Sequence, residues 1–480
     1  MRYIWIIAFF NSLAFGQLNH QLDLHALDSV KRIVPDYRNN LLEYADSSFL
    51  KQNGNFSYTI LPEAMAAGEK DRISLQGGVF LVNRWKTTSN KLQVISSLRA
   101  GYHQGSILPY RSQLKTQAFF EEEIGDDQRL YQDLRARIIF TPNRFLRFHG
   151  GLDQHFIGQG ERSLLLGNQG VPGPFVQLEA KVWKFEYQFI QKIHREGIPG
   201  HFVPKGSSTH FLNFRHKQIF SMGIFETVTH IIKDSIYNRG FDPEYLNPLI
   251  FYRPQEYSLG SSDNVIMGLN MQLKLKRSMI YSQFVLDEFL LSQIVNRSRW
   301  WANKYGVQIG YKWARTYGDK EFFVRSELNL TRPYTYSHLN NMLNYGNQGN
   351  PVAHPLGSNF VESYTEFLFK KGKWQNHTWI QLYMKGIEPE GADTNNISYG
   401  GDLYESYLNY SQEFGVLIGN GQKVHQFQLG NRSSYFIWKE NLEFFVEPRL
   451  IIQRTLGNNH ASMWITMGIQ ARLAARERNY

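Results

Sequence analysis

The sequence predicts an all-β fold: a closed antiparallel outer-membrane β-barrel of about 18 strands, with a small N-terminal part of helix and loop. Three observations predict it. The chain begins with an export signal, Phe, Tyr and Trp make up 15% of its residues, and apolar and polar residues alternate with period two in segments spread along it. No segment approaches the roughly 18 consecutive apolar residues of a membrane-spanning helix, so strands are the only elements that could cross a membrane.

The first 16 residues have the pattern of a signal peptide. Arg2 precedes the apolar run from Ile4 to Phe10, and the small residues Ala14 and Gly16 predict cleavage after Gly16. The run is too short to span a bilayer. The chain contains no Cys, which excludes a lipid-anchored lipoprotein, disulfides, Cys-ligated metals and thiol catalysis.

Residues 17–74 are predicted to form a small periplasmic N-terminal part. Its segment LDLHALDSVKRIV spaces Leu24, Leu27, Val30 and Ile33 at helical intervals, which indicates a short amphipathic helix. We therefore expect helix and loop here rather than strands of the barrel.

Residues 75–480 are predicted to form the transmembrane barrel. In KVWKFEYQFIQ the aromatic residues Trp183, Phe185 and Tyr187 alternate with polar ones, so we expect them on the lipid face. The segments VIMGLNMQLKLK and SMWITMGIQARL repeat the alternation. At about 22 residues for a strand and its share of loop, this region holds about 18 strands. A water-soluble sandwich alternates similarly but needs fewer aromatic residues and more tight turns.

The connections between the predicted strands are of two kinds. Some are short and turn-like, such as RTYGDKE and KKGKW, whereas Phe241–Asp263 and Arg332–Asn359 are long and rich in Gly, Pro, Asn and Tyr. In outer-membrane barrels the long connections lie on the extracellular rim and the short turns on the periplasmic one. We therefore expect both long loops on the same, extracellular rim.

The segment IGQGERSLLLG, from Ile157 to Gly167, has glycines spaced as in a phosphate-binding loop. Such a loop follows a buried apolar strand and precedes a helix. Here the preceding FTPNRFLRFHGGLDQHF mixes charged and aromatic residues, and the Gly and Pro residues of the following GNQGVPGP exclude a helix. The sequence therefore gives no support to a nucleotide site.

Several motifs, in order along residues 150–365, resemble one family. They are HFIGQGERSLLLGNQGVPGPFVQLEAKVWKFEY, GIFETV, YLNPLIFYRPQE, SSDNVIMGLN, QFVLDEF, WWANKYGVQIGYKW, RPYTYSH and AHPLGSNF. Together they are similar to the Wzi-type capsule-assembly barrels, and within that group to the gliding-motility RemB branch of the Bacteroidetes. The resemblance implies a monomeric outer-membrane barrel associated with the retention of surface polysaccharide. It also implies that the Gly-rich motif belongs to the barrel wall and its adjoining loop, where Arg162 would point inward toward Asp153 or Glu161.

Polar residues of these motifs are predicted to meet in the lumen. Inward polar groups need partners, so we expect an arginine (Arg162, Arg253 or Arg332) to pair with a carboxylate and the lumen to be plugged. The acidic members of this network are Glu244, Glu256, Asp287 and Glu288. The alternative is a carbohydrate site, in which aromatic faces stack on sugars. Its candidate residues are Arg253, Trp300, Trp301, Arg332, Tyr334, Tyr336 and His338. The aromatic residues of the long loops could equally pack into a rigid lid.

The sequence indicates no enzyme, cofactor or metal site. Asp287 and Glu288 are adjacent, so on a strand they would face opposite sides and could not act as a glycosidase pair. His338 and His354 lack a third ligand at helical spacing, and Ser163 has no nucleophile elbow around it. A triad assembled from distant strands is not excluded by sequence.

The leading hypothesis is a non-catalytic outer-membrane barrel that binds or organises surface polysaccharide. The first alternative is a component of gliding motility or adhesin display that acts through protein partners, and the second is a channel for a small solute. In an exported barrel, the net charge of +10 favours contact with phosphorylated lipid, including lipopolysaccharide, or with acidic polymer rather than with nucleic acid. The same net charge would also result from basic residues scattered over the surface. The barrel-assembly machinery is a further expected partner.

Overall fold

The computed structural model describes a chain that consists mainly of β-strands. The described residues are 51–53, 55–69, 72–105, 120–125, 127–168, 171–198, 201–217, 219–232, 245, 247, 263–389, 397–438 and 442–471. No helix among them is long and apolar enough to cross a membrane.

The strands follow one another along the chain, interrupted by a few short helical turns. The strands are β1 (Lys51–Asn53), β2 (Phe56–Glu69), β3 (Arg72–Lys86), β4 (Leu92–Gln104), β5 (Phe120–Gly125), β6 (Gln128–Phe140), β7 (Leu146–Asp153), β8 (Gly173–Val182), β9 (Phe185–Ile198), β10 (His201–His216), β11 (Phe220–Ile231), β12 (Asn264–Lys274), β13 (Ser278–Leu286), β14 (Tyr305–Tyr317), β15 (Lys320–Thr331), β16 (Gly346–Asn347), β17 (Asn350–Pro351), β18 (Phe360–Lys371), β19 (Trp374–Ile387), β20 (Gln422–Trp438), β21 (Leu442–Thr455) and β22 (Asn458–Ala471). The helical turns are α6 (Leu291–Val295), η2 (Asn341–Leu343) and η3 (Tyr407–Asn409).

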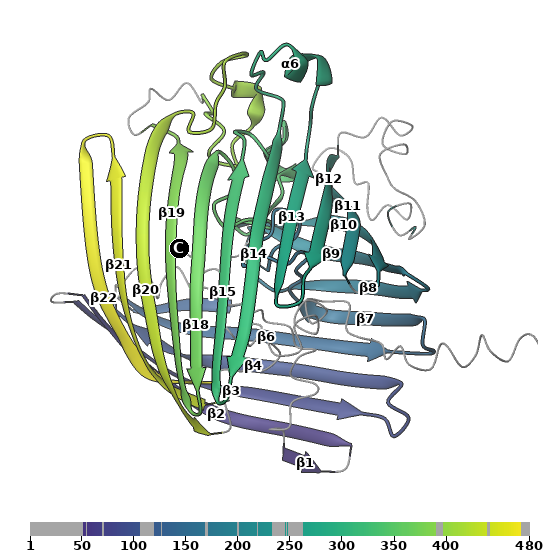
Figure 1. The fold of residues 1–480 in the computed structure, drawn as a ribbon, viewed down its shortest axis with the longest axis vertical. Helices are drawn as coiled ribbons and strands as arrows, with labels where there is room; N and C mark the ends of the chain where they lie inside the picture. The colour runs from purple at the N-terminus through teal and green to yellow at the C-terminus, as the bar shows by residue number, and fades with distance from the viewer. Residues whose placement is uncertain are drawn as a thin grey trace, which may run out of the picture.

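Eighteen of the described strands form one closed antiparallel barrel (Figure 1). The ring consists of β2 to β4, β6 to β15 and β18 to β22, and β2 pairs with β22 to close it, with Ala64 opposite Ile469. The short strands β1 and β5 pair with β2 and β6, and β16 and β17 form a separate ribbon. The predicted fold class is confirmed.

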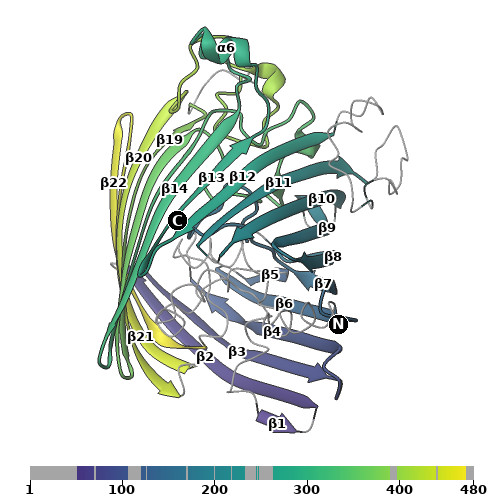
Figure 2. The same cartoon turned by 45° about the vertical axis from the view of Figure 1, so that its right-hand side comes forward.

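The two walls of the barrel cross at a steep angle. Figure 2 shows β13 to β22 rising on the left, while β2, β3, β4 and β6 slope down toward the lower right. Strands of a closed barrel are tilted relative to its axis, so opposite walls must cross in this way. The arrangement encloses a lumen toward which alternate side chains of every strand point.

The barrel begins earlier than the sequence predicts. β2 and the first residues of β3 lie within 17–74, the segment expected to be periplasmic. In β2 the contrast between the two faces is weak: the outward positions hold Pro62 and Ala64, while inward Leu61 and Met65 flank Glu63. Alternation of apolar and polar residues is therefore not visible in this strand. The signal peptide and the helix expected near residues 22–34 lie outside the described residues.

The outward face of the barrel is apolar and carries a belt of aromatic residues. Trp183 is 62% exposed in the β8–β9 turn and Phe185 lies exposed beside it, whereas Tyr187 is partly buried with its hydroxyl 2.5 Å from His210 Nδ1. Exposed aromatic residues recur near the ends of other strands at the same rim. They are Phe56, Trp85, Phe140, Phe148, Tyr317, Trp374 and Trp438. Such a girdle is typical of the membrane interface of outer-membrane barrels.

The long connections all lie on one rim, which they share with the short β2–β3, β9–β10 and β21–β22 turns. The connections after β7, β11, β13, β15 and β19 are long, and each of these strands runs in the same direction round the ring. The turns after β8, β10, β12, β14 and β18 are short and lie on the other rim, with the aromatic belt. The two long loops expected on one rim follow β11 and β15, so they do share a rim, although most of 241–263 lies outside the described residues.

Candidate functional site

The Gly-rich segment forms part of a plug in the lumen. It lies in the connection between β7 and β8, where Ile157 and Leu166 pair as an isolated bridge. Gly158 has φ +145°, and a Cβ there would lie 2.2 Å from Gln283 Nε2. A residue without a side chain is therefore required where the segment passes the barrel wall. The motif was expected in the barrel wall and its adjoining loop, and all of it lies in the loop, because β7 ends before it and β8 begins after it.

A second connection, between β15 and β18, folds against the first. The Tyr336 hydroxyl donates to the Leu164 carbonyl (2.7 Å), and the Tyr345 hydroxyl donates to the Leu165 carbonyl (2.9 Å). Around these bonds lies an apolar core enclosed by the barrel. Its members include Ile157, Leu164, Leu165, Leu166, Ile190, Phe211, Phe225, Ile266, Val285, Val352, Leu356 and Phe360. Two loop segments and the inward faces of several strands thus pack into one core inside the lumen.

An ionic cluster fixes the plug to the wall. Arg325 on β15 forms ion pairs with Glu161 of the plug and with Glu366 of β18, the latter at 2.5 Å. Glu327, which accepts a hydrogen bond from the Tyr281 hydroxyl at 2.6 Å, lies 3.9 Å from Arg325. These side chains are largely shielded from solvent. One guanidinium therefore balances carboxylates from the plug and from two strands.

Arg162 is buried in the same region and contacts an aromatic ring of the wall. Its guanidinium lies over the Tyr364 ring, 5.4 Å from the centroid. Asp153 pairs instead with Arg137 at 2.5 Å, and Glu161 pairs with Arg325. The two carboxylates expected beside Arg162 thus have other arginines of the wall as partners.

The acidic pair Asp287 and Glu288 shares one lysine. Lys304 Nζ lies 3.6 Å from an Asp287 carboxylate oxygen and 3.3 Å from Glu288. Asp287 also accepts a hydrogen bond from the Tyr336 backbone N–H at 2.8 Å. Both residues follow the end of β13, so the expectation that they face opposite sides of a strand does not apply to them. They pair with Lys304 rather than with an arginine, and Glu244, Arg253 and Glu256 lie outside the described residues.

The Asp287 carboxyl should make stability depend on pH. Burial raises the pKa of Asp287 to about 7, against the opposing effect of Lys304. This folded-state pKa exceeds the ordinary value, so the folded chain gains a proton and stability as pH falls from about 7 toward 4. We expect the thermal unfolding midpoint to rise between pH 8 and pH 5 more in the native chain than in Asp287→Asn, as measured by heat-modifiable gel migration. Equal pH profiles for the two chains would contradict the assignment.

An aromatic cluster caps the plug on the rim of long connections. The Trp301 ring stacks on Tyr410 with centroids 4.7 Å apart, and it also contacts Tyr407 and Tyr334 at 5.2 and 5.6 Å. Backbone bonds from Trp301 N–H to Glu413 O and from Val416 N–H to Arg299 O hold the two loops side by side. We call Trp300, Trp301, Tyr334, His338, Tyr407 and Tyr410 the aromatic cap.

The aromatic cap brings together most of the predicted sugar-binding residues. Trp300, Trp301, Tyr334 and His338 belong to it, and Arg332 adjoins it by donating to the carbonyl oxygens of Trp300 and Val416. Tyr336 does not: it is buried in the plug. Arg253 lies outside the described residues. Tyr407 and Tyr410 were missed, although the segment DLYESYLNYSQEF shows a similar density of Tyr in a loop.

Only part of the aromatic cap is open to solvent. Tyr334 is 0% exposed and donates from its hydroxyl to the Ser398 carbonyl, so its ring serves as packing. His338 is buried, and burial lowers its pKa to about 4, which leaves the imidazole neutral at neutral pH. Tyr410 is 37% exposed, and Trp300 and Trp301 are partly exposed. The rings able to meet a ligand are therefore Trp300, Trp301 and Tyr410.

No group of three or more His, Cys, Asp or Glu side chains among the described residues is arranged to hold a metal ion. The Glu362 carboxylate of β18 and His354 Nε2 of the plug, 2.8 Å apart and buried, form a pair between the wall and the plug. Their burial on all sides separates them from any substrate, so this pair is structural.

No family model and no curated protein matches this sequence. Solved structures do resemble the fold. Wzi of Escherichia coli, an outer-membrane protein involved in group 1 capsule assembly and described as a carbohydrate-binding β-barrel, is 12% identical, with 86% of this chain and 83% of that chain covered and a TM-score of 0.52. OprD of Pseudomonas aeruginosa is 8% identical (88% and 98% covered, TM-score 0.46), and OccAB2 of Acinetobacter baumannii is 9% identical (88% and 98% covered, TM-score 0.44). The likeness to Wzi is one of fold.

Proposed function

We propose that this chain is a non-catalytic outer-membrane barrel that binds or organises surface polysaccharide through its rim of long connections. The apolar outward face, the aromatic belt at one rim and the long connections at the other support the membrane location. In this orientation the aromatic cap faces the cell exterior. Contacts with lipid and lipopolysaccharide, insertion by the barrel-assembly machinery and a monomeric state belong to the same proposal.

The observation that carries the proposal is the row of partly exposed rings in the aromatic cap. Trp300, Trp301 and Tyr410 are held in place by stacking and by backbone bonds between two loops, so their faces are fixed before a ligand arrives. Aromatic faces suit the flat, apolar sides of sugar rings. Arg297 and Arg299 of the same loop are exposed and supply cations for acidic substituents. The shared fold with a carbohydrate-binding barrel makes polysaccharide the first ligand class to test.

Replacing Trp300 and Tyr410 together by Ala should weaken binding to the polysaccharide of the producing cell about tenfold, because two stacking faces are lost. The measurement is retention of purified protein on immobilised cell-surface polysaccharide, with cell-bound polymer as the second readout. Trp374→Ala with Tyr317→Ala is the matched control, since it removes the same ring types from the opposite rim. Undiminished binding by the Trp300 and Tyr410 variant, or equal loss in the control, would refute the site.

A second candidate function, protein contact in gliding or adhesin display, is favoured by a different observation. The loop that carries α6 exposes Phe289, Leu290, Leu291, Ile294 and Val295, and Val295 is 71% exposed. Exposed apolar patches on a rim in water mark protein interaction sites. Deleting the gene and measuring both cell-bound polysaccharide and colony spreading separates the two functions: loss of polymer alone supports the first, and loss of spreading alone supports the second.

A further inference from the structure

The outward wall of β15, β18, β19, β20 and β21 contains a groove. Their register aligns one residue of each strand in a row across the wall. The row consists of Leu328, Ser363, Leu382, Phe427 and Ile452. Leu328 and Leu382 are exposed on this wall. The residues that precede Leu328, Ser363 and Leu382 in the sequence are Glu327, Glu362 and Gln381, and all three are buried inside. The row therefore lies on the face that meets lipid in the proposed location.

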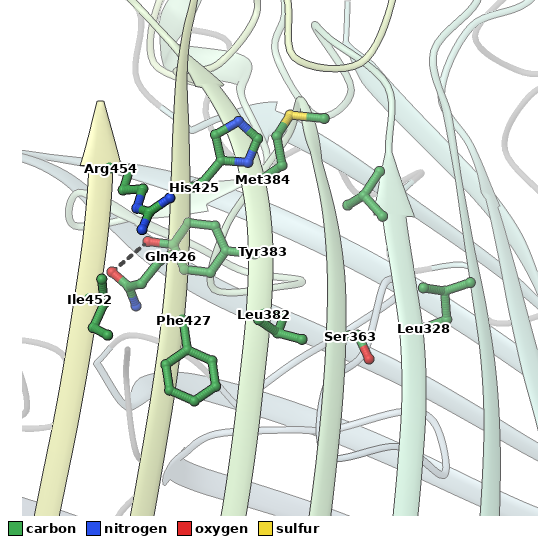
Figure 3. Close-up of a pocket in the computed structure, with 11 residues that line it drawn as sticks. Leu328, Ser363, Leu382, Tyr383, Met384, His425, Gln426, Phe427, Ile452 and Arg454 are labelled. Carbon is green, nitrogen blue, oxygen red and sulfur yellow. Dashed lines mark hydrogen bonds between the residues drawn. The ribbon is translucent and has the colours of Figure 1, made fainter. Parts of the chain in front are cut away.

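The groove arises from a short side chain between long ones. Ser363 lies between Leu328 and Leu382, and in the next row Ser326 and Thr365 bond to each other at 2.9 Å. The resulting cavity measures about 670 Å³ and is lined mainly by apolar side chains (Figure 3). Small residues on an otherwise bulky apolar wall leave a depression that lipid chains or water must fill.

Cationic side chains lie at one end of the groove. The row next to the apolar one, toward the rim of long connections, ends in His425 and Arg454, and Lys423 follows on the same face of β20. All three are exposed, and none takes part in the ion pairs between described residues. Alternate residues of a strand are about 7 Å apart, so the basic side chains lie about 7 Å from the apolar row along the strands.

We propose that this groove binds one acyl chain of a phosphate-bearing lipid, with the phosphate against Arg454, His425 and Lys423. The apolar row matches the chain, and the basic row, on the side of the long connections, matches the anionic head group. A zwitterionic lipid with the same chains would fill the apolar row but gain less from the basic one. The inference rests on the membrane location of the proposed function and not on polysaccharide binding.

The test uses the full-length barrel, purified in detergent and titrated with lipid in native mass spectrometry. The probes are phosphatidylglycerol and phosphatidylcholine with identical chains, and glycerol phosphate as a head group without a chain. The native chain should bind phosphatidylglycerol about tenfold better than phosphatidylcholine, and Arg454→Glu with Lys423→Glu should remove that preference. Leu382→Trp, which fills the groove, should weaken binding of both lipids.

The matched control is Lys276→Glu with Arg277→Glu, which reverses two exposed charges in the β12–β13 turn on the opposite rim. It should keep the native preference. The proposal is overturned if the control loses the preference as the Arg454 and Lys423 variant does, if the native chain has no preference, or if glycerol phosphate binds as well as the lipid. Because these measurements contain no polysaccharide, a negative result would overturn lipid binding by the groove and would say nothing about polysaccharide binding by the aromatic cap.

Discussion

Replacing Arg325 by Met should destabilise the folded barrel by about 3 to 5 kcal/mol, the cost of leaving buried carboxylates without their partner. Arg325 is paired with Glu161 and Glu366 and lies near Glu327, and all these groups are shielded from water. Met keeps the length and apolar volume of the side chain, so the lost charge dominates the result. The unfolding midpoint, read from heat-modifiable migration on gels, should fall steeply, with less folded protein recovered from the membrane.

The matched control is Arg277→Met in the exposed β12–β13 turn, which should leave the midpoint within the scatter of a surface substitution. The triple variant Arg325→Met, Glu161→Gln and Glu366→Gln supplies a second check, because it removes two of the carboxylates that would otherwise be left unpaired. It should recover a large part of the lost stability. A native midpoint in Arg325→Met itself would show that the cluster does not fix the plug to the wall.

The barrel could be predicted from sequence because its strands are recognisable from the pattern of residues within each strand. Alternation with period two follows from strand geometry and from the opposite environments of the two faces, so KVWKFEYQFIQ indicates a strand by itself. β2 was not predicted, because it lacks this alternation. Pro62 and Ala64 face outward while Leu61 and Met65 face inward, so its two faces do not differ in polarity. Its place in the ring is determined by its pairing with β22 and β3.

The site could be predicted only in part, because it depends on loop backbone conformation and on distant contacts. Tyr334 and Tyr336 were expected on one binding surface, yet one packs in the aromatic cap and the other in the plug. Both have positive φ, 65° and 73°, which turns the chain sharply between them, so spacing by two residues no longer means one face. The partners of Arg325 come from residues 161 and 366, and no spacing rule connects them.

The composition of the loops was nevertheless informative. The density of Trp, Tyr and His in WWANKYG and RPYTYSH predicted residues that do converge, because aromatic rings in long loops bury one another for lack of any other core. The same packing removes most of them from solvent. Composition thus located the cluster, and only the structure separates its buried rings from the exposed faces of Trp300 and Tyr410.

The purified barrel should show no large, steady conductance in planar bilayers, and loosening the plug should create it. Inward residues along the wall, among them Gln308, Asn329 and Glu362, are buried, so in the described part of the chain the plug fills the lumen beside them. Tyr336 and Tyr345 hold the two plug segments together through the Leu164 and Leu165 carbonyls and through the apolar core. Replacing both by Ala removes two buried aromatic side chains, at a cost of about 3 to 5 kcal/mol each.

Because this cost falls on contacts between loops rather than on the strand ladder, the barrel should persist while the plug opens. We expect Tyr336→Ala with Tyr345→Ala to give frequent channel openings in protein that still shows heat-modifiable migration. Tyr336→Phe with Tyr345→Phe is the control, since it deletes the two hydroxyls but keeps the rings, and it should stay closed most of the time. Steady conductance in the native chain would show that the plug does not occlude the lumen. A closed double-Ala barrel would show that the occlusion depends instead on the ionic cluster around Arg325.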